Sequence, residues 1–198
     1  MDPNLIEKVK EVIRTTNINY SPYYHVLPEL INARGYTQGI ELGVFTAGNI
    51  LSILNNTKAK LVIGVDPYKE YPAGALSMGT IESQEEFDCL YDLVIQSLDQ
   101  GRNHLIRESS DLAFKFYFYN SECDFDWVFI DAMHTYENCK RDLENYSQLI
   151  RKGGLVCVHD WLHGSFPGVT KAIQEFSEEH NAPIIPREFY FAYMEKTW

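Results

Sequence analysis

The sequence predicts an α/β protein with a doubly wound, mostly parallel sheet, and two patterns predict it. Short, nearly continuous apolar runs rich in β-branched and aromatic residues are typical of strands covered on both faces. Segments with helical periodicity separate these runs, and strand–helix–strand repetition implies right-handed crossovers between parallel strands. The predicted strands cover residues 39–44, 60–66, 103–108, 125–131 and 154–160.

The helices predicted between the strands rest on apolar stripes. One such stripe predicts a helix over residues 84–98. A second predicts a helix over residues 135–151, with Thr135 as its N-cap and Lys152-Gly153-Gly154 as its end. Shorter helices are expected at 49–54 and 169–179, and residues 114–119 are assigned to a helix because the topology requires one there. The stripe of residues 84–98 consists of Phe87, Leu90, Tyr91, Val94, Ile95 and Leu98.

Both ends of the chain differ from this middle part. Residues 1–35 precede the first strand and are predicted to form a helical cap of two helices, broken near residues 17–22. Residues 36–180 are predicted to form the α/β core and residues 181–198 an antiparallel closing strand, so that the 198 residues make a single domain. The irregular segment 67–83 is predicted to be a lid. Candidate pocket walls are the aromatic residues Tyr68, Tyr71, Trp161 and Phe166.

The charge balance excludes several classes of partner. Seventeen Lys and Arg residues against 28 Asp and Glu residues give a net charge of −11, which repels nucleic acid and anionic membranes. No apolar run approaches the roughly 18 residues of a membrane span, and the amino-terminal segment lacks the pattern of a signal peptide. We therefore expect a cytoplasmic protein whose partner is a small molecule, with a homo-oligomer left open.

Acidic residues follow the predicted strands, where an open parallel sheet binds its ligands. Glu41 opens a glycine-rich turn that also contains Gly43, Thr46 and Gly48, and Asp66 ends the second strand. Glycines admit a ligand close to the backbone, and a carboxylate about 20 residues later is typical of ribose binding. A dinucleotide favours G-x-G-x-x-G, whereas the spacing here is G-x-x-x-x-G beside an acid. A cationic cofactor, S-adenosylmethionine, therefore fits better than NAD.

Three stretches of the chain carry a family pattern. They are IELGVFTAGNI at residues 40–50, LVIGVD at residues 61–66, and FDWVFIDAMHTYENCKRDLENYSQLIRKGGLVCVHDW at residues 125–161. Together they resemble class I S-adenosylmethionine-dependent methyltransferases, and more narrowly the small-molecule O-methyltransferases of the macrocin and mycinamicin group. The resemblance covers most of residues 36–180 and implies a seven-stranded, Rossmann-like methyltransferase fold. Ala47 and Asn49 depart from it, since the family commonly has glycine and serine there.

The resemblance also assigns cofactor contacts. It implies that Glu41 and Gly43 line the methionine part of S-adenosylmethionine, that Asp66 holds the ribose, and that Ser109 or Ser110 lies near the adenine. The complete set of predicted cofactor-binding residues is Glu41, Gly43, Thr46, Gly48, Asp66, Ser109, Ser110 and Asp131.

Asp131 and Asp160 are the metal ligands that the resemblance implies. In the family's strand order they end neighbouring strands, about 5 Å apart at Cα, and two carboxylates so close repel unless one is protonated or a cation lies between them. Oxygen ligands favour Mg²⁺, Mn²⁺ or Ca²⁺. As an alternative, Asp131 orients the cofactor and Asp160 caps a loop, as in metal-free relatives. No third acidic ligand can be matched.

Histidine supplies the predicted proton acceptor. The resemblance implies that His134, three residues after Asp131, is the general base of the sugar-methylating members, because a histidine with a near-neutral pKa can take a hydroxyl proton. His159 is expected in the core or behind the site. The predicted function is S-adenosylmethionine-dependent methyl transfer to a hydroxyl of a small molecule, assisted by a divalent metal such as Mg²⁺. A non-catalytic S-adenosylmethionine-binding regulatory module and a metal-independent N-methyltransferase stay open as alternatives.

Overall fold

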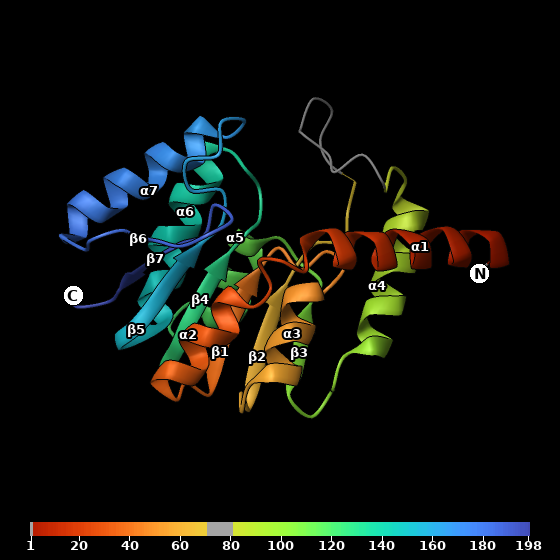
Figure 1. Ribbon diagram of the computed structural model, residues 1–198, viewed down its shortest axis with the longest axis horizontal. Coiled ribbons are helices and arrows are strands. Elements are labelled where there is room, and N and C mark those ends of the chain that lie inside the picture. Colours follow the sequence, from red (N-terminus) through yellow and green to blue (C-terminus); the bar gives the residue numbers. More distant parts are fainter. Residues whose placement is uncertain (1, 71–80) are drawn as a thin grey trace.

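Seven strands form one sheet in the computed structural model, which describes residues 2–70 and 81–198 (Figure 1). The strand order is β3-β2-β1-β4-β5-β7-β6, with β1 to β5 parallel and β7 antiparallel to both of its neighbours. The predicted doubly wound, mostly parallel, seven-stranded fold is therefore confirmed. The strands are β1 (Gln38–Leu42), β2 (Leu61–Val65), β3 (Asn103–Ile106), β4 (Phe125–Ile130), β5 (Ile150–Val158), β6 (Ile185–Pro186) and β7 (Ala192–Glu195).

Helices cover both faces of the sheet (Figure 1). Successive side chains of a strand point to opposite faces, so β4 contributes to two hydrophobic clusters. Trp127 and Phe129 are buried with α2 (Val26–Arg34), α3 (Gly48–Asn56) and α4 (Gln84–Ser97). Val128 and Ile130 are buried on the other face. The helices there are α5 (Ser110–Ala113), the π-helix Phe114–Phe118, α6 (Tyr136–Tyr146) and α7 (Pro167–His180).

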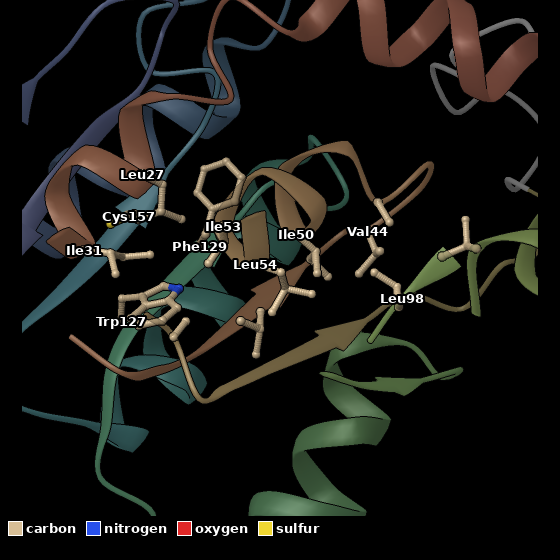
Figure 2. Packing of buried hydrophobic residues seen from close by; sticks show 14 of the residues in the cluster. Leu27, Ile31, Val44, Ile50, Ile53, Leu54, Leu98, Trp127, Phe129 and Cys157 are labelled. Atoms are coloured by element: carbon tan, nitrogen blue, oxygen red, sulfur yellow. The ribbon is translucent and has the colours of Figure 1, made fainter. Parts of the chain in front are cut away.

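The cluster around Trp127 joins α2 and α3 to the sheet. Both Trp127 and Phe129 are fully buried, and an added Cβ at Gly39 of β1 would lie 2.1 Å from the Trp127 ring, so a glycine is required beside it. Burial of such large side chains is a main source of stability in a sheet of this kind. Figure 2 shows the packing of Leu27, Ile31, Ile50, Ile53 and Leu54 around these two rings.

The amino-terminal part contains two helices that pack differently. α1 (Pro3–Tyr20) extends beyond the sheet and packs on α4 and α3, as an appended helix does (Figure 1). α2 instead buries Val26, Leu27 and Ile31 in the core. Within the predicted helical segment 1–35, α2 thus covers the sheet with its apolar face, whereas α1 is the appended part. The helix break lies at residues 21–25, slightly later than predicted.

The helix predicted over residues 135–151 is wrong at its end. Thr135 is the N-cap, as predicted, but α6 ends at Tyr146, and β5 begins at Ile150 after the 3-10 turn Ser147–Leu149. Ile150 pairs with Phe125 of β4, and Arg151 Nε donates to Asp126 Oδ1 over 2.7 Å. Pairing with β4 thus overrides the helical period of the stripe.

The carboxyl-terminal tail forms two short strands, β6 and β7, where a single closing strand was predicted. Phe189 and Tyr190, in the loop between them, adopt left-handed φ angles of 57° and 58°. Residues 71–80 of the predicted lid, including Tyr71, lie outside the described residues. In the described part of the chain no helix is both long and apolar enough to span a membrane.

Candidate active site

A cavity of about 830 Å³ opens where the parallel strands end. Cavities of roughly 300–1,000 Å³ hold ligands of the size of drugs and cofactors, so this one can hold a cofactor together with an acceptor. All the residues that the sequence singled out for cofactor, metal and base line it: Glu41, Gly43, Thr46, Gly48, Asp66, Ser109, Ser110, Asp131, His134 and Asp160. The structure therefore brings every predicted site residue to one place.

Gly43 allows β1 and β4 to meet at this edge. Its φ is +83°, and an added Cβ would lie 1.9 Å from the backbone oxygen of Asp131. Asp131 N in turn donates to Leu42 O over 2.9 Å. Only glycine fits this turn, which holds the first residue after β4 against the end of β1.

Asp66 organises the turn that follows Gly43. Its Oδ2 accepts hydrogen bonds from the backbone N–H groups of Val44 and Phe45, both over 2.9 Å, and its Oδ1 accepts one from Tyr68 N over 2.8 Å. Burial raises the pKa of Asp66, while these donors act in the opposite direction. A carboxylate accepts about four hydrogen bonds, so about one position is left for a ligand. The predicted ribose contact stays a prediction, and the turn-holding role had no signal in the sequence.

Glu41 is buried beneath the same turn. Asn49 Nδ2 donates to Glu41 Oε2 over 2.7 Å, so the asparagine that departs from the family pattern is the partner of the acid. Burial raises the pKa of Glu41 well above its ordinary value, although the Asn49 hydrogen bond lowers it. A cationic ligand in the cavity would favour the charged form of Glu41.

Thr46 and Gly48 connect the turn to the amino-terminal segment. Thr46 Oγ1 donates to Asn17 Oδ1 over 2.6 Å, and an added Cβ at Gly48 would lie 2.4 Å from the Tyr24 ring and 2.5 Å from Asn17 Oδ1. Ser52 Oγ of α3 donates to the Tyr24 backbone oxygen over 2.7 Å. These two predicted cofactor residues therefore also hold residues 17–24 over the cavity.

Two histidines bridge the two carboxylates at the centre of the cavity. His134 Nε2 lies 2.9 Å from Asp160 Oδ2 and 3.6 Å from Asp131 Oδ1. His159 Nδ1 lies 3.4 Å from Asp160 Oδ1 and 3.6 Å from Asp131 Oδ1. Tyr23, from the segment between α1 and α2, donates its hydroxyl to Asp131 Oδ2 over 3.3 Å and packs on the His159 ring at 4.7 Å. The sequence carries no signal for Tyr23, and it placed His159 only behind the site.

The carboxylates raise the pKa of both histidines. Burial disfavours the charged form of His134, but hydrogen bonds and the charges of Asp131 and Asp160 outweigh it and raise the pKa of His134 to about 10. The pKa of His159 is also raised, against burial, by the same two acids. Burial acts to raise the pKa of Asp160, but the histidines hold it well below its ordinary value. At neutral pH His134 is therefore an imidazolium here, which cannot accept a proton.

The donor atoms of Asp131, His134 and Asp160 all lie within 4.8 Å of one another. Ligands at about 2.0–2.2 Å from one ion lie roughly 3 Å or slightly more from their neighbours, so separations of 2.9 and 3.6 Å suit a shared cation. Carboxylates suit Mg²⁺ and Mn²⁺, whereas an imidazole adds preference for transition metals. The residues present thus fit a divalent cation. His134, which the sequence predicted as a base and not as a ligand, lies where a third donor atom would be.

Aromatic rings form one wall of the cavity. Phe166 stacks on His134 with ring centres 4.3 Å apart, and His163 stacks on Phe166 at 4.9 Å. Tyr190, from the strained loop before β7, meets His163 edge-on at 4.7 Å. Of the predicted aromatic walls that can be described, Phe166 lines the cavity. Tyr68 and Trp161 pack into the two hydrophobic clusters instead.

The model of a methyltransferase domain family matches residues 39–161 of the chain. The chain belongs to this family. The match contains the glycine-rich turn, the acidic residues that follow β2, β4 and β5, and the histidines His134 and His159. The predicted resemblance to class I methyltransferases is therefore confirmed. A relative described as uncharacterized protein R132 of Acanthamoeba polyphaga mimivirus is 26% identical over 170 residues, which are 81% of this chain and 71% of the relative.

Solved methyltransferase structures share the fold. An O-methyltransferase from Bacillus cereus in complex with SAH has a TM-score of 0.65 at 14% identity, over 99% of this chain and 92% of its own. The O-methyltransferase NovP has a TM-score of 0.63 at 17% identity, over 89% of this chain and 79% of its own. At these identities the similarity establishes the fold of the methyltransferase and leaves its acceptor open.

Proposed function

We propose that the protein transfers the methyl group of S-adenosylmethionine to a hydroxyl oxygen of a small molecule. The observation that carries this proposal is the convergence of Glu41, Asp66, Asp131 and Asp160 around one cavity behind a glycine turn. A cofactor with a sulfonium and an amino group supplies positive charge that such a rim tolerates. The SAH bound to the Bacillus cereus relative and the O-methyltransferase activity in the names of two relatives support the same reaction.

In the proposed reaction the acceptor oxygen attacks the methyl carbon in line with the sulfonium sulfur. The carbon–sulfur bond breaks, its electron pair stays on sulfur, and S-adenosylhomocysteine forms. The protein holds the two reactants in line and keeps water out. Both effects lower the barrier to methyl transfer when the reacting atoms are well oriented. The hydroxyl proton passes to a base. His134, at the centre of the cavity, is the candidate in its neutral form, which a cation beside Asp131 and Asp160 would favour by offsetting the carboxylate charges.

We propose that Asp131 and Asp160 hold a divalent cation, Mg²⁺ or another hard ion, next to the ring of His134. A bound cation would lower the pKa of an acceptor hydroxyl and share the charge of the carboxylates. The donor separations support this proposal. Metal-independent transfer to a hydroxyl or an amine is the alternative, and a specific observation favours it: the protonated ring of His134 already places a positive charge beside both carboxylates.

Calorimetry with purified protein and S-adenosylhomocysteine tests the cofactor. We expect binding by the wild-type chain, and its absence would overturn the proposal. Turnover is then measured as S-adenosylhomocysteine release with hydroxylated sugars, phenols and amines. We expect His134→Gln to lower turnover while the affinity for S-adenosylhomocysteine stays unchanged. Tight binding without turnover on any acceptor would indicate a regulatory module.

Direct titration with Mg²⁺ and Mn²⁺ tests the cation. After treatment with a chelator we expect one ion to bind to the wild-type chain and none to Asp160→Asn. Asp111→Asn, which removes another acid from the lining of the cavity, is the control and should keep the ion. Full turnover in the presence of chelator would favour the metal-independent alternative.

A further inference from the structure

We propose that Ser110 and Asp142 make one end of the cavity selective for a purine with a 6-amino group, with Asp142 as the residue that directs the serine hydroxyl. The inference rests on the proposed function, in which the adenine of S-adenosylmethionine lies against Ser109 and Ser110. It adds a role for Asp142, a residue of α6 that does not line the cavity.

The single proton of the Ser110 hydroxyl is used in a hydrogen bond to Asp142. Ser110 Oγ donates to Asp142 Oδ1 over 2.6 Å. Asp142 is 1% exposed, so water does not replace this donor. An ionised carboxylate only accepts hydrogen bonds, and the serine proton must therefore point toward α6. Ser110 lines the cavity, and the lone pairs of its oxygen are what it can offer to a ligand.

The position of Ser110 is held from a second side. Tyr146, a fully buried residue one turn after Asp142, donates its hydroxyl to the Ser110 backbone oxygen over 2.7 Å. Burial raises the pKa of Asp142 to about 6, with the Ser110 hydrogen bond acting against the rise. At pH 7.5 Asp142 is thus mainly ionised, and α6 contacts both the side chain and the backbone of Ser110.

A hydroxyl oxygen that only accepts distinguishes two kinds of purine. A 6-amino group can donate a hydrogen bond to Ser110 Oγ. A 6-oxo group is itself an acceptor, so its oxygen and Ser110 Oγ would repel each other. The oxo group would pair with Ser110 only if the serine turned its proton away from Asp142. A buried carboxylate would then lose its donor, a loss that corresponds to about a 10- to 100-fold weaker affinity.

Calorimetry with two ligands tests this role at pH 7.5. The probes are S-adenosylhomocysteine and S-inosylhomocysteine, which differ in the amino or oxo group at position 6. We expect the wild-type chain to prefer the amino ligand by about 10- to 100-fold. Ser110→Ala removes the acceptor, and Asp142→Asn supplies an amide that can donate to Ser110 and free its proton. Both variants should bind the two ligands with affinities within about threefold of each other.

Glu144→Gln is the matched control, because it removes a negative charge from an exposed position of the same helix. It should keep the wild-type preference, and circular dichroism should show all variants folded. If the wild-type chain binds neither ligand, the proposed function fails together with this inference. If it binds both equally well, or if Asp142→Asn keeps the full preference, the role of Asp142 is overturned while the proposed function stands.

Discussion

Replacement of Asp142 by asparagine is expected to stabilise the protein, and by an amount that grows with pH. Burial raises the pKa of this carboxyl from its ordinary 3.8 to about 6. The groups that face it are Ser110, Arg141 and Asp111. Because the folded state holds the proton more tightly, the unfolding free energy of the wild-type chain falls as pH rises from about 4 to about 6, and then stays level.

The magnitude follows from the two pKa values. At about 1.4 kcal/mol per pKa unit, ionising Asp142 in the folded protein costs about 1.6 kcal/mol at pH 5 and about 3 kcal/mol at pH 7.5. Asp142→Asn carries no such cost, and its side-chain amide can still form a hydrogen bond with the Ser110 hydroxyl. Relative to wild type, its unfolding free energy should therefore gain about 1.4 kcal/mol between pH 5 and pH 7.5.

Urea unfolding at several pH values, followed by tryptophan fluorescence, to which the buried Trp127 contributes, measures this difference. Glu144→Gln, on the exposed side of α6, is the control and should follow the wild type within about 0.5 kcal/mol at every pH. A difference between Asp142→Asn and wild type that stays constant across this range, or shrinks as pH rises, would refute the account of Asp142 as a buried acid held ionised at a cost.

The remaining predictions concern the turn and the histidine. Gly43→Ala should lower the unfolding free energy by about 3 kcal/mol or more, because the added methyl group clashes with the Asp131 backbone and the φ angle is left-handed. Gly35→Ala, with φ +68° but open space around it, is the control and should lower it by about 1 kcal/mol in the same urea assay. Thr46→Val should cost about 1–3 kcal/mol by leaving the Asn17 oxygen without its donor, and equal stability of Thr46→Val and wild type would contradict that anchor. His134→Gln should be less stable than wild type at pH 7 in chelator. Because the pKa of His134 is raised from 6.5 to about 10, that difference should shrink as pH rises toward 10, and growth instead would argue against the ion pairs.

Much of the fold follows from local patterns. Each apolar run predicted as a strand is a strand, α4 spans Gln84–Ser97 as its stripe predicts, and Thr135 is a cap. These features depend on which side chains must be buried, and the spacing of the apolar residues in the sequence shows that directly. The acidic residues after the strands were predicted to meet for the same reason, because parallel strands end at one edge of the sheet.

Other features depend on contacts between segments far apart in the chain. Ile150 belongs to β5 because β4 offers it a pairing partner, although it continues the stripe of α6. Asp142 belongs to no functional motif of the sequence. Its hydrogen-bond partner, Ser110, lies 32 positions earlier in the chain.

The centre of the site shows the same division. The carboxylates of Asp131 and Asp160 and the imidazole of His134 are present in the sequence pattern, and strand order brings them together. The charge state of His134 arises only when both acids lie within 3.6 Å of its ring in a site shielded from water. Likewise Tyr23 reaches Asp131 across 108 positions, through a helix break that no local pattern marks as functional. Residue types and burial periods are local properties of the chain, whereas pKa values and hydrogen-bond partners belong to the assembled surroundings.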